Sequence, residues 1–215
     1  MLSTSRMTAS QPTEPRSERK RRAILEAAAE TFLRKGYLGT TMDEIAAAAA
    51  VSKQTVYKHF SDKEGLFTEI VTAAVDEVSD PHHEDVLGLA DSGDVETDLR
   101  ALAMRQLERV MQPRLLALRR LVIGEAGRFP ELGRAYYERG AGRTIEALAG
   151  AFERLAARGR LELDDPQLAA AHFNWLVMSI PLNRAMLCGD DELPAPAELE
   201  RYADAGVKVF LAAYA

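Results

Sequence analysis

The sequence of 215 residues predicts an all-α protein of about nine helices. Apolar residues recur at helical spacing along most of the chain, and no segment alternates apolar and polar residues as a half-buried strand would. Proline is tolerated in the first turn of a helix, and four prolines stand near expected helix starts. These are Pro113, Pro130, Pro166 and Pro196.

An arm and a first helix are predicted at the amino-terminal end. Residues 1–17 are rich in Ser, Thr, Pro and Gln and are predicted to form a disordered arm. Beyond them, Ile24, Ala28 and Phe32 lie at helical spacing. Gly36 is expected to end this helix, since glycine readily adopts the backbone conformation of a helix end.

Two short helices are predicted next. Thr41 is followed three residues later by Glu44, which is the pattern of a capping box and predicts a helix that ends near Ala49. Ser52 is well placed to cap a third helix, which should extend through Phe60.

A fourth helix and a long carboxy-terminal helical region are expected to follow. Ser61 and Glu64 repeat the capping pattern, and this helix is predicted to end near Asp80. Residues 80–95 are predicted to form a linker or loop, and Pro181 is predicted to kink or break its helix. The remaining helices are expected at residues 95–111, 113–126, 130–158, 166–188 and 196–213.

Charge divides the chain into two parts. Residues 1–65 carry 11 Lys and Arg against 8 Asp and Glu, a net charge of +3, whereas the remainder has a net charge of −9. Basic surfaces suit nucleic acid, so residues 18–65 are predicted to be a DNA-binding domain. Residues 66–215 are predicted to form a second helical domain. Its acidic charge is interpreted as keeping it away from DNA, with a preference for cationic ligands as the alternative.

Several classes of protein are disfavoured by composition. The single cysteine, Cys188, permits no internal disulfide, and the amino terminus has no secretion signal, so a cytoplasmic location is expected. Residues 166–183 are uncharged but contain too many polar residues to predict a membrane span. No pattern predicts a catalytic site or cofactor, and residues 82–85, HHED, are too local to predict a metal site.

The two short helices and the helix before them describe a helix-turn-helix, with an ordinary helical hairpin as the alternative. Bases are expected to be read by Lys53, Gln54 and Thr55 in the first turn of the third helix. The remaining DNA-binding candidates are Thr41, Ser52, Tyr57, Lys58, His59 and Lys63, chiefly as phosphate contacts. Basic residues at positions 16 and 19–22 either add an electrostatic arm or form a solvated helix start.

Residues 36–67, GYLGTTMDEIAAAAAVSKQTVYKHFSDKEGLF, closely resemble the DNA-binding segment of the TetR/AcrR family of bacterial regulators. The matching positions are Gly36, Thr40, Thr41, Ile45, Ala46, Ala49, Val51, Ser52, Tyr57, Phe60, Lys63, Glu64 and Leu66. Residues 120–140 also look like a ligand-domain segment found in part of this family. One departure is Ala50, where the family usually has glycine. Either alanine adopts the left-handed conformation at a cost of about 1 kcal/mol, or the turn adopts a slightly different geometry.

The resemblance implies a homodimer whose two heads bind a palindromic operator on double-stranded DNA, as a repressor that a small ligand releases. A ligand-independent regulator or an activator remains an alternative, as does a helical small-molecule-binding protein without DNA binding. The last two helices are apolar around more than one face and are predicted to form the dimer surface.

A pocket for a small apolar or amphipathic effector is predicted on the central helices. Aromatic and methionine side chains there suit an adaptable apolar pocket, with an ordinary core as the alternative for each of them. His172 and Trp175 are three residues apart on one helical face and are placed at the pocket edge. The full set of candidates is Met104, Leu107, Met111, Tyr137, Phe152, His172, Trp175 and Met178.

Overall fold

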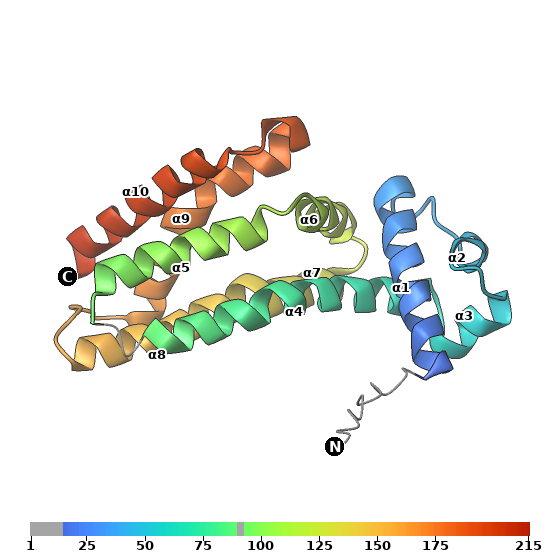
Figure 1. Ribbon diagram of the computed structural model, residues 1–215, viewed down its shortest axis with the longest axis horizontal. Coiled ribbons are helices and arrows are strands. Elements are labelled where there is room, and N and C mark those ends of the chain that lie inside the picture. The colour runs from blue at the N-terminus through green and yellow to red at the C-terminus, as the bar shows by residue number, and fades with distance from the viewer. Residues whose placement is uncertain (1–14, 90–92) are drawn as a thin grey trace, which may run out of the picture. The chain divides into compact units, whose positions relative to one another are not determined.

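The computed structural model describes residues 15–89 and 93–215, and these residues form helices without a strand (Figure 1). Most of the predicted arm therefore lies outside the described residues, and α1 begins at Arg16. The helices are α1 (Arg16–Lys35), α2 (Met42–Ala48), α3 (Lys53–His59), α4 (Lys63–Leu89), α5 (Val95–Val110), α6 (Pro113–Glu125), α7 (Pro130–Tyr137), α8 (Arg143–Ala157), α9 (Pro166–Cys188) and α10 (Pro196–Tyr214). A π-helical turn, Glu138–Gly142, separates α7 from α8, and a short 3₁₀ turn, Asp190–Glu192, follows α9.

The chain divides into two compact units, with the boundary between Phe67 and Thr68. In the first unit, α1 packs against α2 and α3. Ile45 and Val56, one from each short helix, are fully buried. The rings of Phe32, Tyr37 and Phe67 lie 5.0–5.8 Å apart between centroids and fill the space beside them. A small three-helix domain with its own core is the result.

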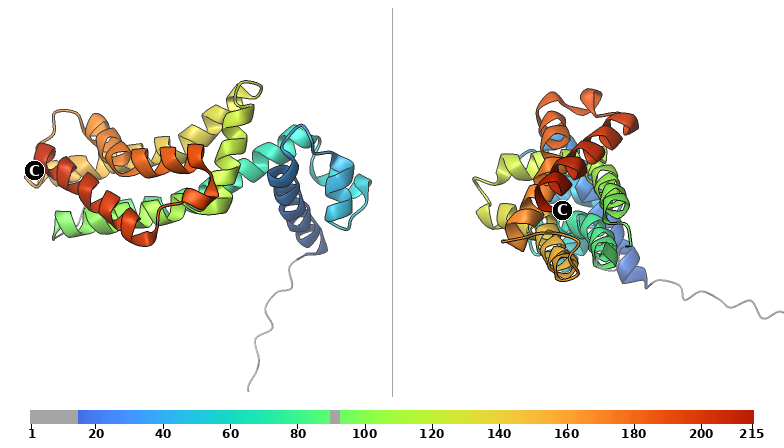
Figure 2. Two further views of the ribbon diagram at one scale, coloured as in Figure 1. Left: turned by 90° about the horizontal axis from the view of Figure 1, so that it is seen from above. Right: turned by 90° about the vertical axis from the view of Figure 1, so that its left-hand side faces the viewer.

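The second unit is a helical bundle. Its helix α10 lies beside α5 and α9, and α8 packs along α9 (Figures 1 and 2). Phe152 of α8, Phe173 of α9 and Phe210 of α10 are fully buried, and their ring centroids are 5.0–5.8 Å apart. The three rings hold these helices together at the centre of the core.

Most predicted helix starts are confirmed. The Thr41 hydroxyl accepts a hydrogen bond from the Glu44 amide, and the Glu44 carboxylate accepts one from the Thr41 amide, so the capping box is present. Ser52 caps α3 by accepting from the Thr55 amide. Four helices begin at the predicted prolines, Pro113, Pro130, Pro166 and Pro196.

The start of α4 differs from the prediction, because Asp62 rather than Ser61 provides the cap. Its carboxylate accepts a hydrogen bond of 2.7 Å from the Gly65 amide. Asp62 and Gly65 are three residues apart, as are Ser61 and Glu64, so the spacing alone does not distinguish the two registers.

The prediction of a loop from residue 80 is wrong, because α4 continues through Pro81 to Leu89. A proline inside a helix costs about 3 kcal/mol. Val86 and Leu89 beyond it are almost fully buried, and their burial favours the helical continuation. Asp85 pairs with two arginines of α5, which holds the same segment in place.

Two further helix predictions concern the second unit. The single helix expected at residues 130–158 is confirmed as a continuous helical run from Pro130 to Ala157, in which the π-helical turn Glu138–Gly142 joins α7 to α8. Pro181 does not end its helix, since α9 runs from Pro166 to Cys188 without interruption. Pro181 is buried, and the packing around α9 compensates for the lost backbone hydrogen bond.

Candidate nucleic-acid interface and ligand cavity

A tight turn joins α2 to α3, and Ala50 lies at its centre. The Ala50 amide donates to the Ala47 carbonyl over 3.2 Å, and the Val51 amide donates to the Ala46 carbonyl over 3.0 Å. This pair of bonds is the Schellman pattern of a helix end. Ala50 has φ of 52°, the only positive φ at a non-glycine position among the described residues. Alanine thus occupies the left-handed conformation that glycine favours.

Helix α3 presents one polar face to solvent. Lys53, Gln54, Tyr57 and Lys58 are exposed, whereas Val56 on the opposite face is fully buried. Positions 53, 54, 57 and 58 share one side of a helix, because residues three and four apart are neighbours. The four side chains therefore form a continuous surface at the start and middle of α3.

The other candidates on α3 are partly used within the protein. The Thr55 and Ser52 hydroxyls are 2.8 Å apart and share a hydrogen bond. His59 is half-buried beside the Phe60 ring. Lys53 forms an ion pair of 2.8 Å with Asp43 of α2, and this pairing raises the pKa of the lysine. Of the predicted base readers, only Gln54 has an exposed side chain that forms no hydrogen bond or ion pair with the other described residues.

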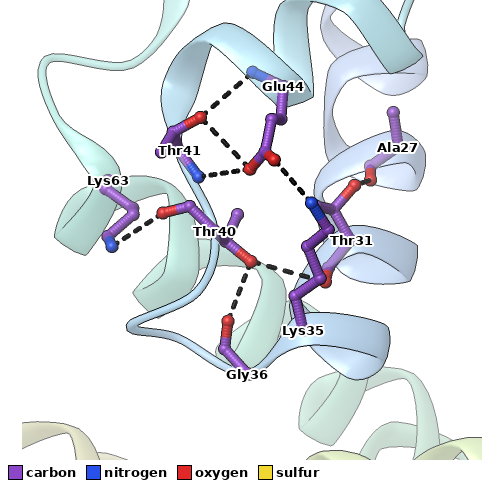
Figure 3. A network of polar contacts seen from close by, with 8 residues as sticks. All are labelled: Ala27, Thr31, Lys35, Gly36, Thr40, Thr41, Glu44 and Lys63. Atoms are coloured by element: carbon purple, nitrogen blue, oxygen red, sulfur yellow. Dashed lines mark hydrogen bonds and ion pairs between the residues drawn. The ribbon is translucent and has the colours of Figure 1, made fainter.

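Thr41 and Lys35 take part in a polar network at the start of α2 (Figure 3). The Glu44 carboxylate accepts from the Thr41 amide over 3.1 Å and from the Lys35 ammonium over 2.5 Å. The hydrogen bond from Lys35 is the main cause that lowers the pKa of Glu44, with the Thr41 bond second. This network anchors the start of α2 to the end of α1.

Lys63 has a structural role that was not predicted from the sequence. Its ammonium donates to the carbonyls of Tyr37 and Thr40, each over 2.8 Å, and lies 4.3 Å from the centroid of the Tyr37 ring (Figure 3 shows the bond to Thr40). The first residue of α4 thereby fixes the loop between α1 and α2. Backbone carbonyls leave no sequence pattern, so spacing alone could not reveal this contact.

A cavity of about 460 Å³ lies among α4 to α9 in the second unit. Such a volume is typical of sites for small molecules. Tyr137, Trp175 and Met178, three of the eight pocket candidates, line it. Most of its wall is aliphatic or aromatic, with a few polar or charged side chains from α4, α5, α6, α8 and α9.

The other five pocket candidates lie elsewhere. Leu107, Met111 and Phe152 are buried in the main core, and Met104 packs against that core. The side chain of His172 is exposed, and its Nδ1 lies 2.6 Å from the Tyr214 hydroxyl. Of the two residues predicted at the pocket edge, Trp175 therefore lines the cavity and His172 does not.

Three polar residues at the cavity wall were not predicted from the sequence. His82, Gln106 and Asn174 line it, and all three are at most 5% exposed. The Gln106 side-chain amide donates to the Asn174 carbonyl oxygen over 2.8 Å, which joins α5 to α9. His82 was not predicted as a wall residue because residues 80–95 were expected to form a loop. It lies four residues from both Val78 and Val86, which continues the helical period of α4.

Burial and charge set the protonation of this wall. Burial first, and then the charge of Arg109, lower the pKa of His82 to about 4. His82 is therefore neutral at pH 7. Asp85 accepts hydrogen bonds from Arg105 over 3.1 Å and from Arg109 over 2.6 Å. Burial would raise the pKa of Asp85, but the two arginines outweigh this effect and lower it.

An apolar stripe remains exposed on α9. Leu176, Ile180 and Leu187 are 39%, 59% and 83% exposed and lie four and seven residues apart, so they share one side of the helix. On α10, Val209 is 54% exposed. Large apolar side chains gathered on one surface are typical of protein–protein contacts.

Two features are absent from the part of the chain that the structure describes. No helix in residues 15–89 or 93–215 is both long and apolar enough to span a membrane. Within the same part of the chain, no three His, Cys, Asp or Glu side chains are grouped so that they could hold a metal ion.

Both halves of the chain match known protein families. Residues 24–70 match the family model "Bacterial regulatory proteins, tetR family", and residues 97–215 match "AefR-like transcriptional repressor, C-terminal domain". The second match alone covers more than half of the 215 residues.

Solved structures resemble the whole chain. A protein from Mesorhizobium loti, described as a TetR-family transcriptional regulator, is 46% identical with a TM-score of 0.86, over 94% of this chain and 99% of that one. The flavonoid-responsive regulator FrrA is 34% identical with a TM-score of 0.72, over 92% and 97% of the two chains.

Matches to curated proteins are confined to shorter segments. The transcriptional activator FasR of Mycolicibacterium smegmatis is 47% identical over 62 residues, which are 29% of this chain and 28% of FasR. A Bacillus subtilis regulator, YhgD, is 40% identical over 77 residues and is matched over 40% of its length. The chain thus spans less than half the length of these two relatives.

Proposed function

The chain belongs to the TetR family of bacterial transcriptional regulators, and we propose that it acts as a homodimeric repressor. In this proposal two helix-turn-helix heads bind a palindromic operator in the cytoplasm. A small apolar or amphipathic ligand enters the cavity of the second unit and releases the DNA.

The observation that carries the proposal is the exposed polar face of α3. Gln54 in the first turn can pair bidentately with adenine, and Lys53 can donate to guanine once it leaves Asp43. Tyr57 and Lys58 are placed one turn later and suit phosphate oxygens. We assign Lys63 to positioning, because its ammonium already binds the loop between α1 and α2.

Dimerisation through α9 and α10 supplies the second head. The exposed Leu176, Ile180 and Leu187 form an apolar stripe that a second copy of α9 and α10 would cover. A two-fold dimer places two identical heads on two half-sites, which is why a palindromic operator is expected.

Helix α4 supports the proposed coupling between ligand and DNA. Its first residue, Lys63, bonds to the loop that precedes α2, and its later residues Val75, Val78, Ser79 and His82 line the cavity. A ligand that moves the cavity end of α4 thus acts on a helix that also contacts the head. The similar regulator FrrA is described as flavonoid-responsive, and a small-molecule response of this kind is proposed here.

Selection of binding sites from random double-stranded DNA, followed by titration at several salt concentrations, tests the proposal. We expect an enriched palindrome. Gln54→Ala should change the preferred base at one position of each half-site by about 1–3 kcal/mol. Lys58→Ala should weaken binding to all DNA sequences alike. It should also lower the slope of log affinity against log salt concentration by about one per subunit.

Arg114→Ala is the matched control, since Arg114 is an exposed cation of α6 that lies outside the head and outside the helices proposed for the dimer. Its affinity for DNA and its salt slope should equal those of the unmodified protein. Absence of any enriched sequence would refute DNA binding. Equal effects of Gln54→Ala and Lys58→Ala on all operator variants would refute the division between base and phosphate contacts.

The related FasR is an activator, so activation is the second candidate. A reporter gene placed behind the selected operator distinguishes the two. Repression predicts higher expression when the regulator is deleted, whereas activation predicts lower expression.

A further inference from the structure

Three polar atoms at the cavity wall have no hydrogen-bond partner among the described residues. They are both ring nitrogens of His82 and Oε1 of Gln106. Both residues line the same cavity, and their exposed fractions are 3% and 5%. A buried polar atom without a partner is unfavourable, so a bound molecule that pairs with these atoms would gain affinity.

The geometry of Gln106 determines the kind of partner. Its Nε2 group already donates to Asn174 over 2.8 Å, so the atom left over is the carbonyl oxygen, which can only accept. A ligand that satisfies this oxygen must carry a hydrogen-bond donor. A neutral imidazole offers one donor and one acceptor, so His82 can serve the same hydroxyl group or a second one.

Charge at the wall excludes one class of ligand. Arg109 and Arg119 line the cavity, whereas no aspartate or glutamate is among its lining residues in the described part of the chain. A cationic ligand would meet these two guanidinium groups at the wall, while Asp85, the carboxylate that pairs with Arg109, does not line the cavity. The acidic net charge of the second unit therefore does not extend to this wall.

The remaining wall favours flat aromatic molecules. Tyr136, Tyr137 and Trp175 contribute aromatic side chains, and Val78, Val122 and Met178 contribute aliphatic surface. Aromatic rings pack well against such side chains, while the polar atoms of Gln106 and His82 mark one place for a polar group.

We propose that the effector is an uncharged hydroxylated aromatic compound whose O–H donates to Gln106 and pairs with His82. This inference rests on the proposed function in taking the cavity as the effector site. It goes further in naming the chemical class and the two residues that select it.

Isothermal titration calorimetry with three probes tests the inference. The probes share a biphenyl body: p-phenylphenol carries a hydroxyl donor, p-methoxybiphenyl carries no donor, and p-phenylbenzylammonium is a cation. We expect the phenol to bind about tenfold more tightly than the ether, because one hydrogen bond to a buried acceptor separates them. The cation should bind most weakly.

Trp175 gives an independent readout, since it is the single tryptophan of the chain and lines the cavity. Its fluorescence should change on binding, with the same order of affinities. Gln106→Met should reduce the preference for phenol over ether to about twofold or less. Gln112→Met changes an exposed glutamine two residues beyond the end of α5 and should keep the full preference.

The comparison of probes on the unmodified protein stands even if Gln106→Met does not fold. A phenol that binds no more tightly than the ether or the cation, including one that does not bind at all, would overturn the inference. DNA release is measured separately with the selected operator. A phenol that binds with the expected preference but leaves DNA binding unchanged would refute ligand release and leave the inference intact.

Discussion

Replacing Ala50 by glycine should leave the protein as stable as before or make it more stable. Ala50 has φ of 52°, and a left-handed conformation costs a residue with a Cβ about 1–2 kcal/mol. Glycine removes this cost. It also makes the unfolded chain more flexible, which opposes folding by about 0.4–1 kcal/mol. The net effect is a stabilisation of about 0–1.6 kcal/mol.

The surroundings of Ala50 support this magnitude. Its side chain is exposed, so removal of the methyl group sacrifices little packing. The two backbone hydrogen bonds of the turn, from the Ala50 and Val51 amides, do not involve the side chain and should persist.

Ala48→Gly provides the matched control. Ala48 is also exposed, but it lies within α2, where glycine costs about 0.5–1 kcal/mol. Both variants make the same chemical change two residues apart, so their unfolded states gain similar freedom. The difference between their free energies of unfolding therefore isolates the backbone conformation at position 50 and should be about 1–2 kcal/mol.

Hydrogen exchange of the α2–α3 amides, together with urea unfolding followed by circular dichroism, measures these free energies. Exchange is needed because a chain of two units need not unfold in one step. Ala50→Gly should slow exchange or leave it unchanged, and Ala48→Gly should accelerate it. If both variants destabilised the head equally, the strain assigned to Ala50 would be refuted.

Three other predictions concern protonation, the loop contact of Lys63 and the dimer. Between pH 6.5 and pH 4, His82 is protonated in the unfolded chain but still neutral in the folded one. The free energy of unfolding should therefore fall by up to about 3 kcal/mol as the pH is lowered through this range. Urea titrations should show no such dependence on His82 in the variant His82→Leu. Lys63→Met should lower the free energy of unfolding by about 2 kcal/mol, because two backbone carbonyls lose a charged donor. Lys58→Met should leave it unchanged. Equal melting temperatures of the two variants would contradict the structural role of Lys63. Ile180→Glu should give monomers in analytical ultracentrifugation, while Leu38→Glu, which alters an equally exposed apolar residue of the head, should remain dimeric.

The helix-turn-helix could be predicted from sequence because its determinants are local. Thr41 with Glu44, and Ser52 with Thr55, act within one turn of helix, so spacing alone reveals them. The conformation of Ala50 was only partly predictable, because the glycine usual in the family indicates a left-handed residue, whereas alanine left a different turn geometry open until its φ of 52° was known.

The second unit was harder to predict because its determinants are distant in sequence. Pro81 normally marks a helix boundary, and the contacts that keep α4 helical beyond it come from α5, twenty or more residues away. The cavity depends likewise on which aromatic side chains the packing leaves at its wall. Phe152 and Trp175 look alike in a helical pattern, yet one is in the core and the other lines the cavity.

The exposed stripe on α9 has a genetic consequence. In the proposed dimer, a subunit with a defective α3, such as Gln54→Ala combined with Lys58→Ala, keeps Leu176, Ile180 and Leu187 and should still pair with normal subunits. In a cell that expresses both alleles, mixed dimers with one working head would deplete the functional pool, so head mutations should be dominant. Mutations of the stripe itself leave normal subunits free to pair with each other and should be recessive.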